Sequence, residues 1–341
     1  MDASNGLCVD VEGVIIPRFL SEECFRSALR FKPKNGDVFV VTYPKCGTTW
    51  MQNLVLNIMR RGRKFEDPSD FYFASPFLDQ WGAEDSEKMM IRPGREAYVA
   101  FPTGVGALMR FLTLVAVMDS SSRGYFQCVP WSDDAKYIYV ARNPKDCCVS
   151  FYHHMKNLPG YQFPDGIKEF FDLFIKGEVE FGDYFDHLLP WYNARHRPNV
   201  YFTTFEEMKM DLKEVAMKVA EFIDKTEAEH LRDNPEVLER ILYNCSFEET
   251  KKVVNAGLSS MYHPENKDFL TKLPKGRIYV IEYVKSLPKR TGTDRKINFI
   301  RKGEIGSYKH ELPPEQNEIL SKIIQERTKE SDVMSLWEKW M

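Results

Sequence analysis

The sequence predicts an α/β protein: a single domain with a central, mainly parallel sheet flanked by helices. Three apolar runs rich in β-branched or aromatic residues, at 37–42, 136–141 and 199–205, have the length and composition of strands. Each run is followed by a turn signal or by apolar residues at helical spacing. Repeated β–α units bring their strands into one parallel sheet through right-handed crossovers, and this predicts the fold class.

The first unit joins the run Asp37–Thr42 to a helix through the segment Tyr43-Pro44-Lys45-Cys46-Gly47-Thr48-Thr49-Trp50. From Met51 onward, apolar residues recur at i, i+3, i+4, i+7 and i+8, which places them on one helical face. The connecting segment is therefore a turn between a buried strand and the start of a helix.

This turn has the chemistry of a phosphate cradle. The first backbone N–H groups of a helix have no internal partner, and the helix dipole favours an anion there. Gly47 allows close approach of the backbone, and Lys45 supplies a positive charge. Thr48 and Thr49 supply hydroxyl donors. The order differs from the G-x-x-x-x-G-K-[ST] loop of nucleotide triphosphatases, because Lys45 precedes the only glycine of the segment.

Two further units complete the sheet. The run 136–141 ends at Arg142-Asn143-Pro144, where Asn-Pro is a turn or N-cap signal. The run 199–205 leads into a helix with apolar residues on one face between Leu212 and Ile223. In parallel sheets, ligands bind outside the carboxyl ends of the strands. Lys45 and Arg142 both follow a strand, so we expect them to converge on one crevice.

The composition narrows the class of protein. A chain of 341 residues with a net charge of −3 and no basic block gives no reason to expect nucleic acid. Seven cysteines without a disulfide pattern or paired C-x-x-C spacing favour reduced thiols and no structural metal. The N-terminus shows no secretory signal, so the expected location is cytoplasmic.

One apolar stretch raises the question of a membrane span. Between Val99 and Met118 only Arg110 is charged, but Pro102 and two glycines interrupt the segment. Its uninterrupted part, 111–118, is much shorter than the roughly 20 residues that a membrane helix needs. We therefore expect a buried helix here and no contact with a membrane.

Four separated segments resemble, in the right order, the cytosolic sulfotransferases. They are 43–50, 141–153, 244–250 and 299–309. The order Y-P-K-x-G-T-T-W is similar to the P-loop-like phosphosulfate loop of that family. The resemblance implies one sulfotransferase domain over 1–341, in which about 83–135 is divergent or inserted and about 253–297 forms a lid loop.

The resemblance also implies a donor, 3′-phosphoadenylyl sulfate (PAPS), and no metal. The phosphosulfate would lie on the turn at Lys45, and Lys45 would stabilise the leaving phosphate during catalysis. Arg142, Ser150 and the segment Arg301-Lys302-Gly303 would hold the 3′-phosphate, since arginine grips phosphate bidentately. Trp50 and Phe247 would stack on the adenine. The full set implied for the donor is Lys45, Cys46, Gly47, Thr48, Thr49, Trp50, Arg142, Ser150, Cys245, Ser246, Phe247, Arg301, Lys302 and Gly303.

The catalytic base of the family is not identified in this chain. It belongs to a K-T-H-x-P segment that precedes the strand ending near Arg142, and this chain has no histidine between Lys64 and Lys136. That part of the sequence is either divergent or a misread part of the gene. His153 and His154 follow a matching motif, and either could reach the acceptor, although we expect a structural role for both.

Two smaller departures concern the adenine and the assembly of the protein. Phe205 stands where the family often has tyrosine, which removes a hydroxyl near the adenine. The segment 309–318 fits the family's short dimerisation motif only in part, because it contains Pro313-Pro314 and proline cannot donate to a paired backbone. A homodimer is therefore left open.

Three functions remain to be compared. The leading one is transfer of a sulfuryl group from PAPS to a hydroxyl or amine of a small acceptor, of phenol, catecholamine or steroid type. The alternative is a pseudoenzyme that binds PAPS, or its product adenosine 3′,5′-bisphosphate (PAP), without efficient turnover. A P-loop kinase is disfavoured by the position of Lys45. The acceptor itself is not defined, and its pocket would be lined by 71–81, 86–130 and 253–298.

Overall fold

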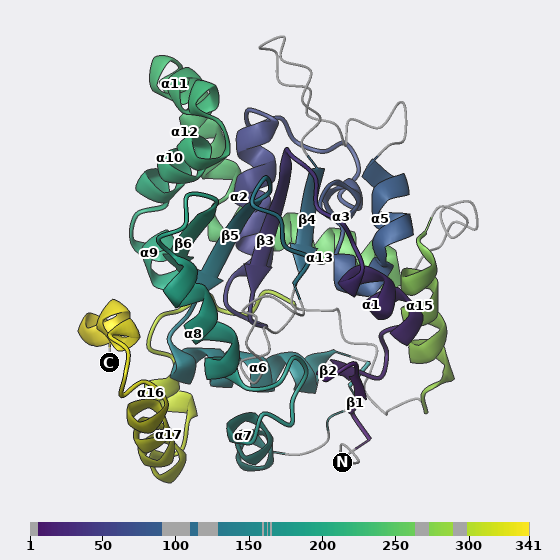
Figure 1. Cartoon of the computed structure of the whole chain (residues 1–341), viewed down its shortest axis with the longest axis vertical. Helices are drawn as coiled ribbons and strands as arrows, with labels where there is room; N and C mark the ends of the chain where they lie inside the picture. The colour runs from purple at the N-terminus through teal and green to yellow at the C-terminus, as the bar shows by residue number, and fades with distance from the viewer. Residues whose placement is uncertain are drawn as a thin grey trace.

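A computed structural model describes residues 6–90, 110–114, 129–158, 160–161, 163, 166–262, 273–288 and 299–340. Its centre is a four-stranded sheet in the order β4-β3-β5-β6, with every neighbouring pair parallel (Figure 1). The strands are β3 (Asp37–Thr42), β4 (Arg110–Leu114), β5 (Lys136–Ala141) and β6 (Val200–Thr204). The register pairs Val40 of β3 with Thr113 and with Ile138.

Helices cover both faces of this sheet, as the sequence predicts. Phe39 and Val41 of β3 pack into one hydrophobic core with α6 (Pro144–Asn157), α7 (Ile167–Ile175) and α8 (Tyr184–Ala194). Val38 and Val40 face a second core, built with α2 (Thr48–Met59), α10 (Leu212–Ile223), α11 (Lys225–Asp233) and α12 (Pro235–Asn244). The side chains of a strand alternate between the two faces of its sheet, so a continuous apolar run serves both cores.

The predicted helix starts are present. Asn143 caps α6 by accepting a hydrogen bond from the backbone N–H of Lys145 at 2.9 Å, and Pro144 begins the helix. Pro235 begins α12 in the same way. Proline suits this position because the N–H that it lacks would have no partner within the helix.

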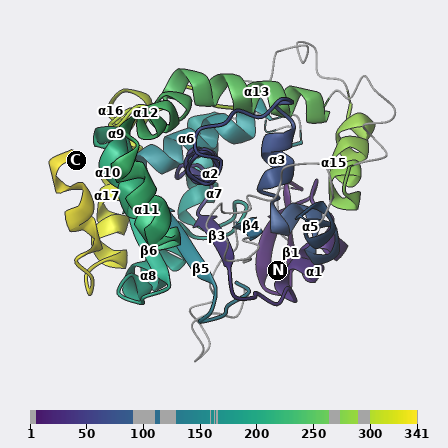
Figure 2. The same cartoon turned by 90° about the horizontal axis from the view of Figure 1, so that it is seen from above.

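The remaining elements surround the edges of the sheet. A short antiparallel hairpin precedes the sheet in the sequence, and α13 packs against α2, α3 and α12 (Figure 2). These elements are β1 (Cys8–Val11), β2 (Val14–Pro17), α1 (Glu22–Leu29), α3 (Asp70–Ala74), α4 (Leu78–Trp81), α5 (Ala83–Met90), α9 (Phe205–Met210), α13 (Phe247–Tyr262), α15 (Lys275–Ser286), α16 (Tyr308–Glu311), α17 (Pro314–Arg327) and a 3-10 helix (Val333–Trp340).

One expectation about the divergent segments is wrong where the structure describes them. A helix is expected at 111–118, but residues 111–114 belong to the edge strand β4. Residues 115–118 lie outside the described residues. A short apolar run does not distinguish strand from helix, and pairing with β3 decides the matter. The segment expected as a lid loop, 253–297, contains the later part of α13 and the whole of α15, and its other parts are not described. That this segment covers the acceptor stays a prediction.

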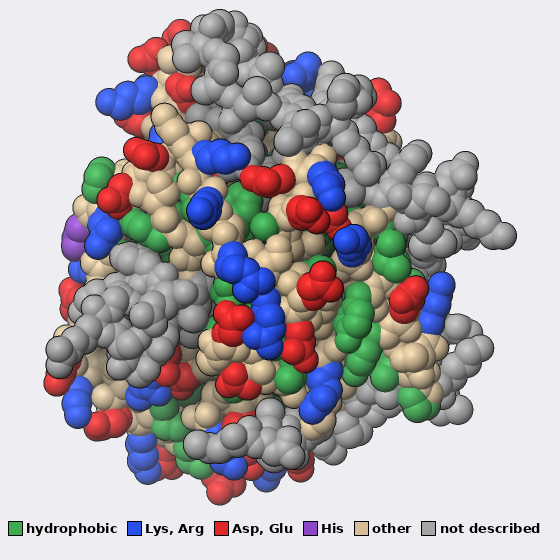
Figure 3. All heavy atoms as spheres, turned by 45° about the vertical axis from the view of Figure 1, so that its right-hand side comes forward, with side chains coloured by type: hydrophobic (Ala, Val, Ile, Leu, Met, Phe, Trp, Pro, Cys, Tyr) green, Lys and Arg blue, Asp and Glu red, His purple; other side chains and the backbone are tan. Residues whose placement is uncertain are grey.

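On the face of the molecule shown in Figure 3, positively charged Lys and Arg side chains are interspersed with negatively charged Asp and Glu side chains. Neither charge dominates this face. Among the described residues, no helix combines the length and the apolar character needed to cross a membrane.

Candidate functional site

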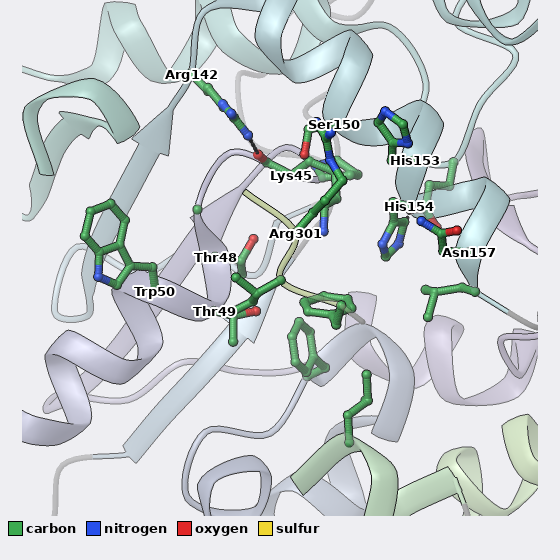
Figure 4. A pocket seen from close by; sticks show the side chains of 18 of the residues that line it. Lys45, Thr48, Thr49, Trp50, Arg142, Ser150, His153, His154, Asn157 and Arg301 are labelled. Carbon is green, nitrogen blue, oxygen red and sulfur yellow. Dashed lines mark hydrogen bonds and ion pairs between the residues drawn. The ribbon is translucent and has the colours of Figure 1, made fainter. Parts of the chain in front are cut away.

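A cavity of about 240 Å³ opens beyond the carboxyl ends of β3 and β5, where the sequence predicts a crevice (Figure 4). Lys45 follows β3 and Arg142 follows β5, and both line this cavity. Nη1 of Arg142 donates a hydrogen bond to the carbonyl oxygen of Lys45 at 3.1 Å, so the two strand ends are joined directly. The predicted convergence of these residues is confirmed.

The backbone of the turn after β3 adopts a shape that few residues tolerate. Lys45 has a φ of 68°, and Gly47 has a φ of 109° as the N-cap of α2. A Cβ atom added at Gly47 would lie 3.2 Å from Cδ2 of Phe205, which is tighter than ordinary contact. No side-chain hydrogen bond caps the start of α2, and Thr48 and Thr49 line the cavity there. The start of α2 therefore presents N–H groups and hydroxyls to a bound anion.

Lys45 is half-buried and faces an aromatic ring. Its Nζ atom lies 4.1 Å from the centroid of the Phe299 ring. Burial lowers the pKa of Lys45 to about 8, and the positive charge of Arg142 lowers it further in the same direction. The ammonium group still carries most of its charge at neutral pH, but little water surrounds it. An anion that enters the cavity would therefore interact with Lys45 more strongly than with an exposed lysine.

Arg142 is held by the backbone rather than by a carboxylate. In addition to its bond to Lys45, Nη2 donates to the carbonyl oxygen of Glu304 at 3.0 Å, and the guanidinium lies 4.3 Å from the centroid of the Phe205 ring. The side chain is 6% exposed, and its buried Nε has no hydrogen-bond partner among the described residues. Within the described ranges Arg142 forms no ion pair, so its charge is available to a phosphate.

A second cluster of cationic side chains, Arg301 and Lys302, donates hydrogen bonds to the carboxylate of Glu311. Nη1 of Arg301 donates to its two oxygens at 2.8 and 3.2 Å, and Nζ of Lys302 donates at 3.2 Å. Nε2 of His153 lies 2.5 Å from Oε2. Burial alone would raise the pKa of Glu311, but the hydrogen bonds from Arg301, His153 and Lys302 outweigh it and lower the pKa to about 2. In this structure, Glu311 therefore accepts from Nη1 of Arg301, a side chain that the sequence assigns to a phosphate.

Two aromatic side chains line the cavity near these cations. Nε1 of Trp50 donates to the carbonyl oxygen of Cys245 at 2.8 Å, which fixes the indole. Phe247 begins α13, and a Cβ atom added at Gly303 would lie 2.6 Å from its Cε2 atom. Gly303 has a φ of 63°, so both its conformation and this close approach require glycine.

Most of the predicted donor residues therefore meet in one place, with three exceptions. The cavity is lined by Lys45, Gly47, Thr48, Thr49, Trp50, Arg142, Ser150, Phe247, Arg301, Lys302 and Gly303. Cys46 is buried, and its sulfur lies 3.7 Å from that of Cys147. Cys245 is buried, and its carbonyl oxygen accepts the hydrogen bond from Nε1 of Trp50. Oγ of Ser246 accepts a hydrogen bond from the backbone N–H of Glu249 at 3.4 Å. These three residues support the walls of the cavity and do not line it.

The other end of the cavity contains residues that sequence reasoning missed. Apolar side chains dominate this end, and they come from the N-terminal hairpin region, from the α3–α4 region and from α13. They are Phe19, Leu20, Tyr72, Phe77, Trp81 and Leu258. Tyr72, Phe77 and Trp81 belong to the expected segment 71–81 and Leu258 belongs to 253–298, whereas most of the third expected segment, 86–130, lies outside the described residues. Phe19 and Leu20 had no sequence signal, because only the tertiary fold brings the chain's beginning to this position.

Two further titratable side chains line the cavity, and the charge of Lys45 influences the pKa of both. His154 and Glu180 both line the cavity, and Nε2 of His154 lies 3.7 Å from Oε1 of Glu180. Burial raises the pKa of Glu180 to about 8, although the hydroxyl of Tyr161 donates to its Oε2. Burial and the charge of Lys45 hold the pKa of His154 well below its usual range.

The parallel sheet, the glycine turn and the cations Lys45, Arg142 and Arg301 together form a cavity at the strand ends whose chemistry suits an anion. A family model described as a sulfotransferase domain matches residues 35–332. This chain belongs to the sulfotransferase family.

Individual relatives agree with that assignment. The chain is 28% identical to rat (Rattus norvegicus) sulfotransferase 1C2 over 302 residues, which cover 87% of this chain and 84% of the relative. It is 26% identical to rabbit (Oryctolagus cuniculus) amine sulfotransferase over 345 residues, covering 99% and 96%. Among solved structures, mouse sulfotransferase SULT7A1 complexed with PAP superposes with a TM-score of 0.64 at 23% identity, covering 98% of each chain.

Proposed function

We propose that this protein transfers a sulfuryl group from PAPS to a hydroxyl or amine of a small acceptor, of phenol, catecholamine or steroid type. One observation carries the proposal: a single cavity is lined by Lys45 just before α2, by Arg142 and Arg301, and by the aromatic side chains of Trp50 and Phe247. Membership of the sulfotransferase family supports it, and so does the PAP complex of the mouse relative. The apolar end of the cavity suits an aromatic or alicyclic acceptor.

The donor would lie between the two cationic groups. The N–H groups and hydroxyls at the start of α2 would hold the phosphosulfate, and Lys45 would face the oxygen that links sulfur to phosphate. Arg142, Arg301 and the backbone around Gly303 would hold the 3′-phosphate, with Trp50 and Phe247 on the adenine. The sulfuryl group passes from that linking oxygen to the acceptor in line, so positioning and charge stabilisation supply most of the acceleration.

The wider expectations belong to the same proposal. We expect one domain over 1–341, a cytoplasmic location, transfer without a metal ion, and no nucleic-acid or membrane partner. Self-association through 309–318 stays an open prediction. Each of these follows from the resemblance of the motifs and the composition of the chain.

A specific observation favours a second candidate, a protein that binds PAPS or PAP without turnover. The chain has no histidine between Lys64 and Lys136, where the family's base belongs. Donor binding and proton removal use different residues, so binding could persist without efficient catalysis. The two candidates therefore differ in turnover and agree in nucleotide binding.

A labelled-sulfate assay separates them. The protein is given PAPS and a panel of phenols, amines and steroids, with and without a chelator, while PAP binding is measured by calorimetry. Transfer to any acceptor supports the enzyme; silence across the panel with intact PAP binding supports the second candidate. Lys45→Ala and Arg301→Ala should each weaken PAP binding, and Lys322→Ala, on the exposed side of α17, is the matched control. If PAP gives no heat with the unaltered protein, both candidates fail.

A further inference from the structure

The cavity continues beyond Lys45 to a buried polar pair that the donor does not need. His154 is the eleventh residue of α6 and Glu180 lies in the loop between α7 and α8, so the pair is assembled only in the folded chain. Both side chains are almost fully buried, at 10% and 6% exposure, and both line the cavity. Buried titratable groups of this kind are costly, and they gather at functional sites.

His154 lies close to the position at which the reaction would occur. Its ring is 5.4 Å from the ring of Phe299, measured between centroids, and Nζ of Lys45 lies 4.1 Å from the centroid of that same ring. Figure 4 shows His154 and Lys45 around the same space. If Lys45 faces the leaving oxygen, the acceptor lies on the opposite side of the sulfur atom. His154 lines the same cavity beside Phe299 and would be within reach of that acceptor.

The surroundings of His154 keep its ring neutral. Burial and the charge of Lys45 lower the pKa of His154 well below its usual range. A neutral imidazole has one nitrogen with a free lone pair, which is the form that can accept a proton. The groups that face it are Lys45 and Glu180, together with the rings of Phe151, Tyr161 and Phe299.

Glu180 has the position of an orienting carboxyl group. Its Oε2 accepts a hydrogen bond from the hydroxyl of Tyr161, and its Oε1 faces Nε2 of His154 at 3.7 Å. A carboxyl group beside a histidine favours one tautomer of the ring, and an imidazolium formed there would favour the ionised form of Glu180, which stabilises the new charge. Lys45 and Asp79 are the other charged groups that influence Glu180.

We propose that His154 accepts the proton of the acceptor hydroxyl during sulfuryl transfer, and that Glu180 and Tyr161 position its ring. The inference rests on the proposed function, and it assigns a base that the motif comparison does not find. As the acceptor oxygen forms its bond to sulfur, its proton passes to a nitrogen of His154. The bond from sulfur to the linking oxygen breaks, and the electron pair stays on the phosphate of PAP, beside Lys45. The products are the sulfate ester, PAP and an imidazolium next to Glu180. The imidazolium of His154 then loses its proton to solvent.

The test uses acceptors that differ in acidity and little in size. Phenol and its fluorinated derivatives, up to pentafluorophenol, form such a series: phenol keeps its proton at neutral pH, and pentafluorophenol has lost it. An acceptor that is already ionised needs no base. Single-turnover rates of transfer from PAPS are measured for the unaltered protein, His154→Gln, Glu180→Gln and His196→Gln, an exposed control outside the cavity. PAP affinity and thermal unfolding are measured for each variant.

We expect His154→Gln to slow transfer to phenol by about 10²–10⁴-fold and to pentafluorophenol by less than about threefold. Glu180→Gln should show the same dependence on acidity with a smaller loss, while PAP affinity stays unchanged in both. A uniform loss across the series, or no loss, would overturn the assignment of His154. If His154→Gln does not fold, Glu180→Gln carries the same comparison.

The unaltered protein separates this inference from the proposed function. If it transfers sulfuryl groups and His154→Gln behaves like the His196→Gln control, only the assignment of the base fails. If it binds PAP and transfers to none of the phenols, amines and steroids, both the base and the enzymatic function fail, and the binding function remains.

Discussion

Removal of the Glu311 charge should tighten the binding of PAP. In this structure, Glu311 accepts hydrogen bonds from Arg301 and Lys302, the residues that we assign to the 3′-phosphate. A phosphate that binds there would share its donors with a carboxylate of the same sign. Glu311→Gln keeps the shape of the side chain and a carbonyl oxygen for Arg301, and it removes the repulsion.

The size of the effect follows from the distances. Oxygens of Glu311 lie 2.8 and 3.2 Å from Nη1 of Arg301, so a phosphate on the same guanidinium would lie about 5 Å from the carboxylate. Two unit charges at that distance repel by about 3 kcal/mol at an effective dielectric constant near 20, and by less than about 1 kcal/mol in bulk water. Glu311 and Arg301 are 19% and 26% exposed, which places the repulsion between these limits.

Part of that gain is offset because Arg301 loses a strong partner and becomes less ordered. Fixing an arginine side chain costs about 1–2 kcal/mol. We therefore expect a net gain of about 1 kcal/mol, or roughly fivefold tighter PAP binding. Calorimetry at neutral pH and low salt measures it, and Glu315→Gln, an exposed change nearby on α17, is the control. Weaker binding by Glu311→Gln would show that the carboxylate holds Arg301 in place and does not compete with the ligand.

Three further outcomes are expected. Because the pKa of Lys45 is lowered to about 8, its positive charge is complete well below that pH and is lost above it. PAP affinity, measured by calorimetry, should therefore fall as the pH rises through 8. An equally steep fall in Lys45→Met would contradict this. Gly303→Ala should weaken PAP binding more than Gly306→Ala. Both glycines have positive φ, but only a Cβ atom at position 303 would lie within 2.6 Å of the Phe247 ring. Equal losses of PAP affinity in a thermal-shift titration would refute this prediction. The pKa of Glu180 is raised from 4.5 to about 8, so the folded protein holds a proton that the unfolded chain has lost, and stability falls as the pH rises between those values. Glu180→Gln should therefore raise Tm near pH 8 and less near pH 5, and a gain that is the same at both pH values would rule out this cause.

The part of the site that the sequence predicts well is the part that local rules determine. Lys45 and Arg142 each follow a strand of a parallel sheet, and such strands end at the same edge, so their meeting can be inferred before the structure is known. The hydrogen bond between them, at 3.1 Å, bears this out. The glycine at position 47 could also be inferred, because its φ of 109° belongs to a strand–turn–helix junction.

The parts that the sequence does not predict depend on long-range packing. Glu180 and Glu311 are single acidic residues in segments that look like solvated surface, and no spacing marks them. Their roles follow from burial beside His154 and Arg301, which only the folded chain creates. The strand at 110–114 was expected to be helical because its short apolar run fits both states, and its partner β3 lies far away in the sequence.

The two ends of the cavity have different origins in the chain. The end at which we place the donor follows directly from β3 and β5 in the middle of the sheet, and both strands are almost wholly buried. The acceptor end is assembled from peripheral elements such as the N-terminal hairpin region, α4 and α13. Substitutions at this rim can therefore alter which compound is modified while the reagent that modifies it stays the same.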